Sequence, residues 1–220
     1  MQATARPTTF IDLIIPGTGL LRDVLLVFAF AVIVALFAQI AVRLPFTPVP
    51  ITGQTLAVLL TGGALGARRG AASLGLYAIA GSLGIAVFAP SSTNLEGSLV
   101  HFILPWEGTG AALWDIVSGG YIVGFIVAAY AVGSLAEKGW DRGSRVLLAM
   151  LLANLLIYIP GLLWLAYKIE SFDNATAVGP ENKSAISLHL VSFRANFVIL
   201  FFVILKSIPC FLISARNSSN

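Results

Sequence analysis

One segment governs the interpretation of this chain: Pro45-Phe46-Thr47-Pro48-Val49-Pro50-Ile51-Thr52-Gly53-Gln54-Thr55. Three of its first six residues are proline, which lacks a backbone N–H and restricts the residue before it, so a helix cannot continue here. The segment lies between two uncharged apolar runs, residues 24–42 and 54–67, each predicted to span a membrane. We therefore predict a stiff loop at one face of a bilayer, where binding residues are common. An ordinary connector is the alternative.

The composition places the whole chain in a membrane. Hydrophobic residues make up 58% of the 220 and charged residues 10%, and the mean hydropathy is +0.92. Only helices or a closed barrel satisfy the backbone in lipid, and barrel strands would alternate between apolar and polar residues. The uncharged runs are continuous. The predicted fold class is therefore all-α, an integral membrane bundle of six transmembrane helices.

Charge predicts how the bundle is oriented. The predicted spans are residues 24–42, 51–67, 70–90, 116–136, 146–167 and 195–214. Six spans put both termini on one side, together with eight of the Lys and Arg residues, against four on the other side. The positive-inside rule therefore makes both termini cytoplasmic and the proline-rich loop external. Residues 1–20 are expected to form an N-terminal interfacial segment, and residues 21–215 a single six-helix membrane domain.

Motifs of catalysis and metal binding are not found in the sequence. It has no GxSxG, HExxH or phosphate-binding loop, and its single cysteine and two distant histidines have no metal-ligand spacing. We therefore expect no enzymatic activity, no cofactor and no metal site. Small residues recur at four-residue spacing, which lets helices approach closely in lipid and favours a packing role. The two glycine-containing sets are Gly62, Gly66 and Gly70, and Gly120, Gly124 and Ala128.

Polar and aromatic residues inside the predicted spans are candidates for binding. Gly120 and Tyr121 open the fourth span at the depth of the proline-rich loop, where glycine would expose backbone groups to a cavity; an interfacial aromatic belt is the alternative. Asn154 and Tyr158 lie one turn apart in the fifth span, and an amide at this depth needs another helix or a ligand as partner. Lys206 lies inside the last span, where an ammonium is either functional or extends toward the interface.

Residues 45–59 strongly resemble the signature of the BioY family, the biotin-specific substrate-binding (S) components of energy-coupling-factor vitamin transporters. Similar blocks follow in the family's order over residues 24–167. They are Leu65-Gly66-Ala67-Arg68-Arg69-Gly70, Tyr77 with Gly81, Gly84-Ile85-Ala86-Val87-Phe88, Gly119-Gly120-Tyr121-Ile122-Val123-Gly124-Phe125, and Tyr158-Ile159-Pro160-Gly161-Leu162-Leu163-Trp164-Leu165. Residues after 167 depart from the family pattern, so this part of the membrane domain is atypical.

The resemblance implies a function and partners. It implies a high-affinity biotin-binding subunit that mediates biotin uptake as a multi-pass protein of the plasma membrane. It also implies coupling to a separate transmembrane scaffold subunit and two ATP-binding subunits, with Ala31 and Ala35 of the first span as the docking face. The alternative function is a small-solute carrier or channel that works without an ATPase module, because spans interrupted by Gly and Pro suit carriers.

Given biotin as the ligand, its chemistry suggests which residues would bind it. A ureido group needs hydrogen-bond donors and acceptors, the apolar ring needs aromatic walls, and the carboxylate needs a cation such as Lys206 or Arg43. The predicted biotin-binding residues are Phe46, Thr52, Gln54, Phe88, Gly120, Tyr121, Asn154, Tyr158 and Lys206.

Overall fold

The computed structural model of the chain describes residues 9–15, 17, 19–42, 51–90, 100–140 and 145–176, with the backbone alone for 169–176. The described helices are α1 (Phe10–Ile14), α2 (Leu20–Gln39), α3 (Gln54–Leu65), α4 (Ala67–Ser82), α5 (Gly119–Glu137) and α6 (Arg145–Thr176). The predicted helical class is confirmed. The predicted span 195–214 and the candidate residues Phe46, Lys206 and Arg43 lie outside the described residues.

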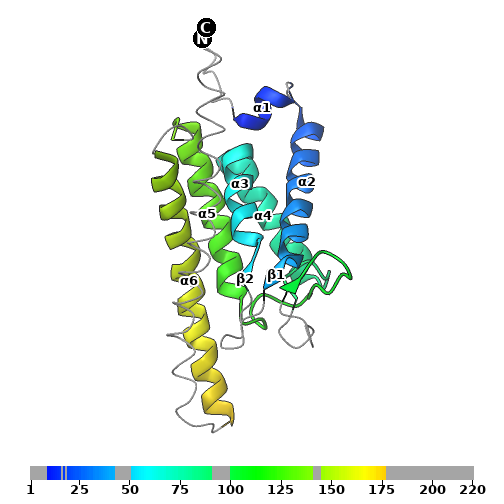
Figure 1. Cartoon of the computed structure of the whole chain (residues 1–220), viewed down its shortest axis with the longest axis vertical. Helices are drawn as coiled ribbons and strands as arrows, with labels where there is room; N and C mark the ends of the chain where they lie inside the picture. The colour runs from blue at the N-terminus through cyan, green and yellow to red at the C-terminus, as the bar shows by residue number, and fades with distance from the viewer. Residues whose placement is uncertain are drawn as a thin grey trace.

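The helices form a bundle in which α5 is central (Figure 1). It packs against α3 and α4 on one side and α6 on the other, while α2 packs against α3 and α4. Among the described residues, α2, α5 and α6 are long and apolar enough to cross a membrane. The number of spans therefore stays a prediction.

The helices α3 and α4 are shorter than the predicted spans because one glycine separates them. Gly66 has φ +83°, a conformation that side-chain-bearing residues rarely adopt, and α4 begins at the next residue. The side chain of Glu137, at the end of α5, accepts a hydrogen bond from the Ala67 backbone N–H at 2.8 Å. The spans predicted at 51–67 and 70–90 leave Arg68 and Arg69 in a turn between them; this is wrong, since both belong to the first turn of α4.

Glycines in the bundle allow close helix contact, as the packing interpretation predicts. A Cβ on Gly62 of α3 would lie 2.6 Å from the carbonyl oxygen of Ala129 in α5. A Cβ on Gly124 of α5 would lie 2.7 Å from the carbonyl oxygen of Ile157 in α6. Such distances leave no room for a side chain. Because glycine has none, the helices can approach each other this closely.

An ionic cluster joins α1, α2 and α4 at one end of the bundle. Arg69 donates to both carboxylate oxygens of Asp12, at 2.9 and 2.7 Å, and to Asp23 at 3.1 Å. Arg22 adds a 2.9 Å bond to Asp12, and the Thr9 hydroxyl donates to Asp12 at 2.7 Å. Hydrogen bonds from Arg69 hold the pKa of Asp12 well below its ordinary value, against the opposing effect of burial; Thr9 and Arg22 add to the lowering.

The lowered pKa of Asp12 predicts a loss of stability in acid. A carboxyl whose pKa is lowered by folding stabilises the protein above its unfolded pKa, about 3.9, and loses that contribution as the pH falls below it. We expect the temperature of the unfolding midpoint to decrease as the pH is lowered from 5 to about 3. The decrease should be smaller in Asp12→Asn, which has no carboxyl to protonate at this position. Thermal unfolding of both proteins in detergent across this range measures the difference; parallel pH profiles would contradict the assignment.

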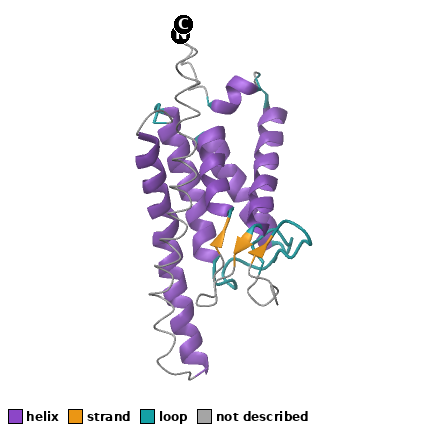
Figure 2. Ribbon diagram, viewed as in Figure 1, coloured by secondary structure: helices purple, strands orange, loops and turns teal. Residues whose placement is uncertain are grey.

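A small sheet, which the all-α prediction did not include, closes the opposite end of the bundle (Figure 2). Its strands are β1 (Ala41–Val42), β2 (Ile51–Thr52) and β3 (Val100–His101), in the order β2-β1-β3 and antiparallel throughout. The first part of the proline-rich segment lies outside the described residues, while its later residues form β2 and the start of α3 and are not the loop that was predicted. The predicted third span is wrong beyond Ser82, since the chain then turns and Phe88 pairs with Thr109.

Candidate functional site

The candidate site lies at the end of the bundle that carries the sheet. Gln54 is the first residue of α3 and follows β2 by two positions. Its side-chain amide donates to the Tyr77 hydroxyl of α4 at 2.5 Å, and its oxygen accepts from the Thr52 hydroxyl at 3.2 Å. A buried carboxamide held from both sides has a fixed orientation, as recognition of a polar ligand requires.

Aromatic side chains pack beside this amide. The rings of Tyr77 and Phe88 meet edge to face, with centroids 5.4 Å apart and planes at 71°. A Cβ on Gly81 would overlap the Phe88 ring, so this glycine lets the ring approach α4. Phe88 comes from the segment after α4 instead of a membrane span, yet it is almost fully buried in the same core as Tyr77.

A second aromatic pair joins α5 to α6. Tyr121 and Tyr158 meet edge to face with centroids 5.6 Å apart and planes at 88°. Both belong to the core that contains Tyr77 and Phe88. The structure thus brings together three of the predicted site residues, Phe88, Tyr121 and Tyr158, in one buried cluster.

Two predicted residues have packing or local partners. A Cβ on Gly120 would overlap Trp164 of α6 and would lie 2.6 Å from the Pro160 carbonyl oxygen, so this glycine permits close contact between α5 and α6. Gly120 was predicted to expose its backbone to a cavity, but in the structure it packs against α6. Asn154 is 2% exposed and donates to the Met150 carbonyl of its own helix at 2.9 Å, a partner that the sequence did not predict. A ligand contact of either residue stays a prediction.

Ala31 and Ala35, the predicted docking residues, lie on the inner side of α2. They are 7% and 6% exposed and belong to the buried core. Their burial favours packing within this chain, and docking through them stays a prediction.

Two residues at the site were missing from the predicted set. Tyr77 lies in a block that resembles the family, but it was not assigned a role. Gln39, at the end of α2, is fully buried and donates from its side-chain amide to the Phe88 carbonyl at 3.2 Å. The signal for Gln39 was available, because it is the one amide in the apolar run 24–42.

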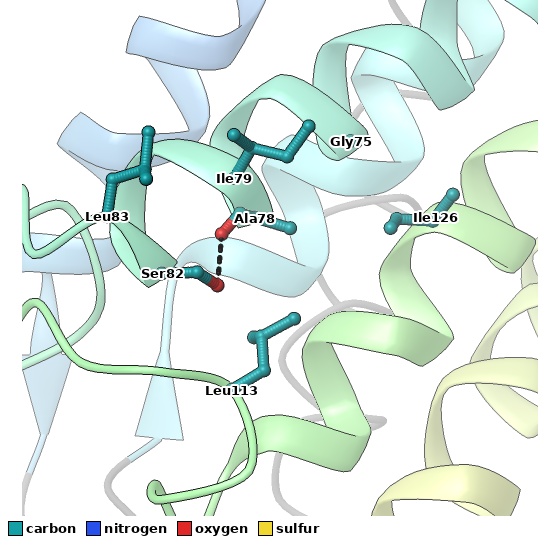
Figure 3. Close-up of a pocket in the computed structure, with 7 residues that line it drawn as sticks. All are labelled: Gly75, Ala78, Ile79, Ser82, Leu83, Leu113 and Ile126. Atoms are coloured by element: carbon teal, nitrogen blue, oxygen red, sulfur yellow. Dashed lines mark hydrogen bonds between the residues drawn. The ribbon is translucent and has the colours of Figure 1, made fainter.

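An apolar groove of about 330 Å³ lies elsewhere, between α4, α5 and the segment before α5 (Figure 3). None of the predicted site residues that the structure describes lines it, and the Ser82 hydroxyl donates to the Ala78 carbonyl at 2.8 Å. Ligand sites usually combine apolar walls with a few converging polar groups. The lining described here supplies the walls alone; its residues are Gly75, Ala78, Ile79, Ser82, Leu83, Leu113 and Ile126.

Comparison with known proteins gives one family and one solved structure. The model of the BioY family matches residues 5–207. A crystal structure at 2.1 Å, described as the S-component for biotin from an ECF-type ABC transporter, matches with a TM-score of 0.58 at 18% sequence identity. The match covers 91% of this chain and 92% of that chain, and at this identity it establishes a shared fold. No curated protein matches the chain.

Proposed function

Because the chain belongs to the BioY family, we propose that it is a membrane subunit that binds biotin with high affinity and mediates its uptake. The observation that carries the proposal is the family match over residues 5–207, which includes the proline-rich segment and every predicted site residue. The fold shared with a biotin S-component supports the same ligand class. Biotin is bound and released unchanged in this proposal, so no catalytic group is needed.

The site has chemistry that suits biotin. The Gln54 carboxamide and the Tyr77 hydroxyl offer donors and acceptors to a ureido group. Phe88, Tyr121 and Tyr158 offer aromatic walls to the apolar bicycle. A cation for the carboxylate would come from Lys206 or Arg43, which remain predictions from the sequence.

We further propose that the subunit works with a transmembrane scaffold subunit and two ATP-binding subunits in the plasma membrane. The solved structure of similar fold belongs to an ECF-type ABC transporter. Arg22 and Arg69 gather at one end of the bundle and the sheet at the other, which suits a cytoplasmic end and an external, ligand-binding end. In this orientation both termini are cytoplasmic and six helices span the membrane.

Equilibrium binding of radiolabelled biotin to the purified protein in detergent tests the ligand. We expect saturable binding with biotin recovered unchanged; absence of binding at micromolar biotin would overturn the proposal. Uptake into cells with and without the scaffold and ATP-binding subunits tests the partners. Uptake that is independent of ATP-binding subunits would favour the alternative, a carrier or channel.

Truncating either a polar or an aromatic side chain of the site is expected to weaken biotin binding. Gln54→Ala removes an amide proposed to bond the ureido group, which should cost about 1–2 kcal/mol of binding free energy. Tyr121→Ala removes an aromatic wall and should cost a similar amount, about 1–2 kcal/mol. Tyr130→Ala, an exposed tyrosine on the same helix, is the matched control and should bind normally. Unchanged affinity in both site variants would contradict the site assignment.

A further inference from the structure

The side-chain amide of Gln39 has a hydrogen-bond partner for its nitrogen and, among the described residues, none for its oxygen. It is 0% exposed, and its amide nitrogen donates to the Phe88 carbonyl. Its amide oxygen, Oε1, is buried and has no hydrogen-bond partner among the residues that the structure describes. An unpaired buried acceptor costs about 1–3 kcal/mol, so proteins seldom keep one without a use.

Backbone pairing brings the end of α2, where Gln39 lies, to the start of α3, where the candidate site lies. β1 pairs with β2 in the antiparallel register Ala41↔Thr52, and the next inward pair is joined by a bond from the Gly53 N–H to the Ile40 carbonyl at 3.0 Å. Gln39 is the last residue of α2 and Gln54 the first residue of α3, so each comes directly before or after this pairing along the chain. The two carboxamides therefore belong to helix ends that adjoin the same pair of strands.

The two amides differ in how many of their polar atoms already have a protein partner. The nitrogen and the oxygen of Gln54 each have a protein partner, Tyr77 and Thr52. Among the residues that the structure describes, Gln39 has a partner for its nitrogen alone, and that partner is the backbone carbonyl of Phe88, whose ring packs against Tyr77. Gln39 is therefore oriented by the segment that carries Phe88, while its acceptor stays free.

We propose that Gln39 is a ligand-recognition residue whose Oε1 accepts an N–H of the ureido group of biotin. This inference rests on the proposed function and deepens it by naming a residue that selects for a urea-type donor. A ligand N–H removes the cost of the unpaired oxygen when it binds, so binding is favoured over that of an analogue without the donor. A carboxylate in the same place would prefer a positively charged donor.

Two variants of Gln39 test the proposal, with biotin and 2-iminobiotin as ligands. In 2-iminobiotin the urea carbonyl is replaced by an imine, which makes the group a cation that still donates N–H bonds. Gln39→Met keeps the length of the side chain and removes its oxygen, and we expect about ten-fold weaker biotin binding. Gln39→Glu keeps an oxygen and adds charge, and we expect its preference for 2-iminobiotin over biotin to rise about ten-fold above that of the wild type.

The preference ratio in Gln39→Glu is the decisive readout, since it needs no comparison with a variant that fails to fold. A ratio equal to that of the wild type overturns the proposal, even if Gln39→Met binds weakly, because Gln39 would then act through Phe88 alone. Thr61→Val is the matched control; its buried hydroxyl bonds to the Ala57 carbonyl of its own helix, and both ligands should bind as to the wild type. Failure of the wild type to bind biotin would instead overturn the proposed function.

Discussion

Gly133→Ala is expected to destabilise the protein by about 3 kcal/mol, since overpacking costs 1–3 kcal/mol and more where the neighbour cannot move. Gly133 lies in α5 opposite the turn between α3 and α4. A Cβ there would overlap the backbone nitrogen of Ala67 and the carbonyl carbon of Gly66. Because the obstacle is backbone, no side-chain rotation relieves it. Gly66 is itself held at φ +83°, so the turn cannot easily shift.

Gly75→Ala provides the matched control for this substitution. Gly75 is also a glycine inside a helix, but an added Cβ would meet no heavy atom within 4 Å in the part of the chain that the structure describes. Alanine is a better helix former than glycine, so this variant should gain up to about 1 kcal/mol. Thermal unfolding in detergent, followed by circular dichroism, measures both. Equal midpoints for Gly133→Ala and the wild type would contradict the packing of α5 on the α3–α4 turn.

Arg69→Met should also cost about 3 kcal/mol, the lower end of the range for breaking a buried ion pair, since the cluster is partly open to solvent. Arg69 bridges Asp12 of α1 and Asp23 of α2, and its side chain is 20% exposed. Methionine keeps the apolar part of the side chain but leaves two carboxylates close together. Arg22 still pairs with Asp12, which limits the loss.

The neighbouring arginine is the control for this prediction. Arg68 is exposed, and Arg68→Met should change stability by less than about 0.5 kcal/mol. The double variant Arg69→Met with Asp12→Asn should lose less than the sum of the two single losses, because both changes break the same bond. Thermal unfolding at pH 7 of the four variants and the wild type measures these differences. Additive losses would mean that the two residues do not interact.

Sequence reasoning located the helical core of the fold but not the turns, and the binding role of the site residues stays a prediction. The start of α3 at Gln54 and the span of α5 follow from where proline stops a helix and where charge ends an apolar run. The break at Gly66 did not follow, since glycine inside an apolar run is equally consistent with helix packing. The three strands are each two residues long, too short for an alternating pattern to be visible.

The partners of the site residues depended on contacts between distant segments. Gln54 and Tyr121 were identified from their motifs, but the bond from Gln54 to Tyr77 joins residues 23 positions apart. The bond from Gln39 to Phe88 joins residues 49 positions apart and depends on the chain turning back after Ser82. Local patterns carry no information on such pairs, because hydropathy reports where each segment prefers to lie and not what it touches.

The sequence by itself determined that this is a helical membrane protein of the BioY family with polar and aromatic residues close to the proline-rich segment. It could do so because the transfer of apolar runs into lipid and the conformational limits of proline are local properties of the chain. Tertiary structure alone decided that Phe88, Tyr121 and Tyr158 share one core and that Ala31 and Ala35 face inward. It also decided that the side-chain oxygen of Gln39 has no partner within the described part of the chain. These outcomes depend on how closely glycines let helices approach and on which buried polar atoms find partners, and both are settled when the segments pack together.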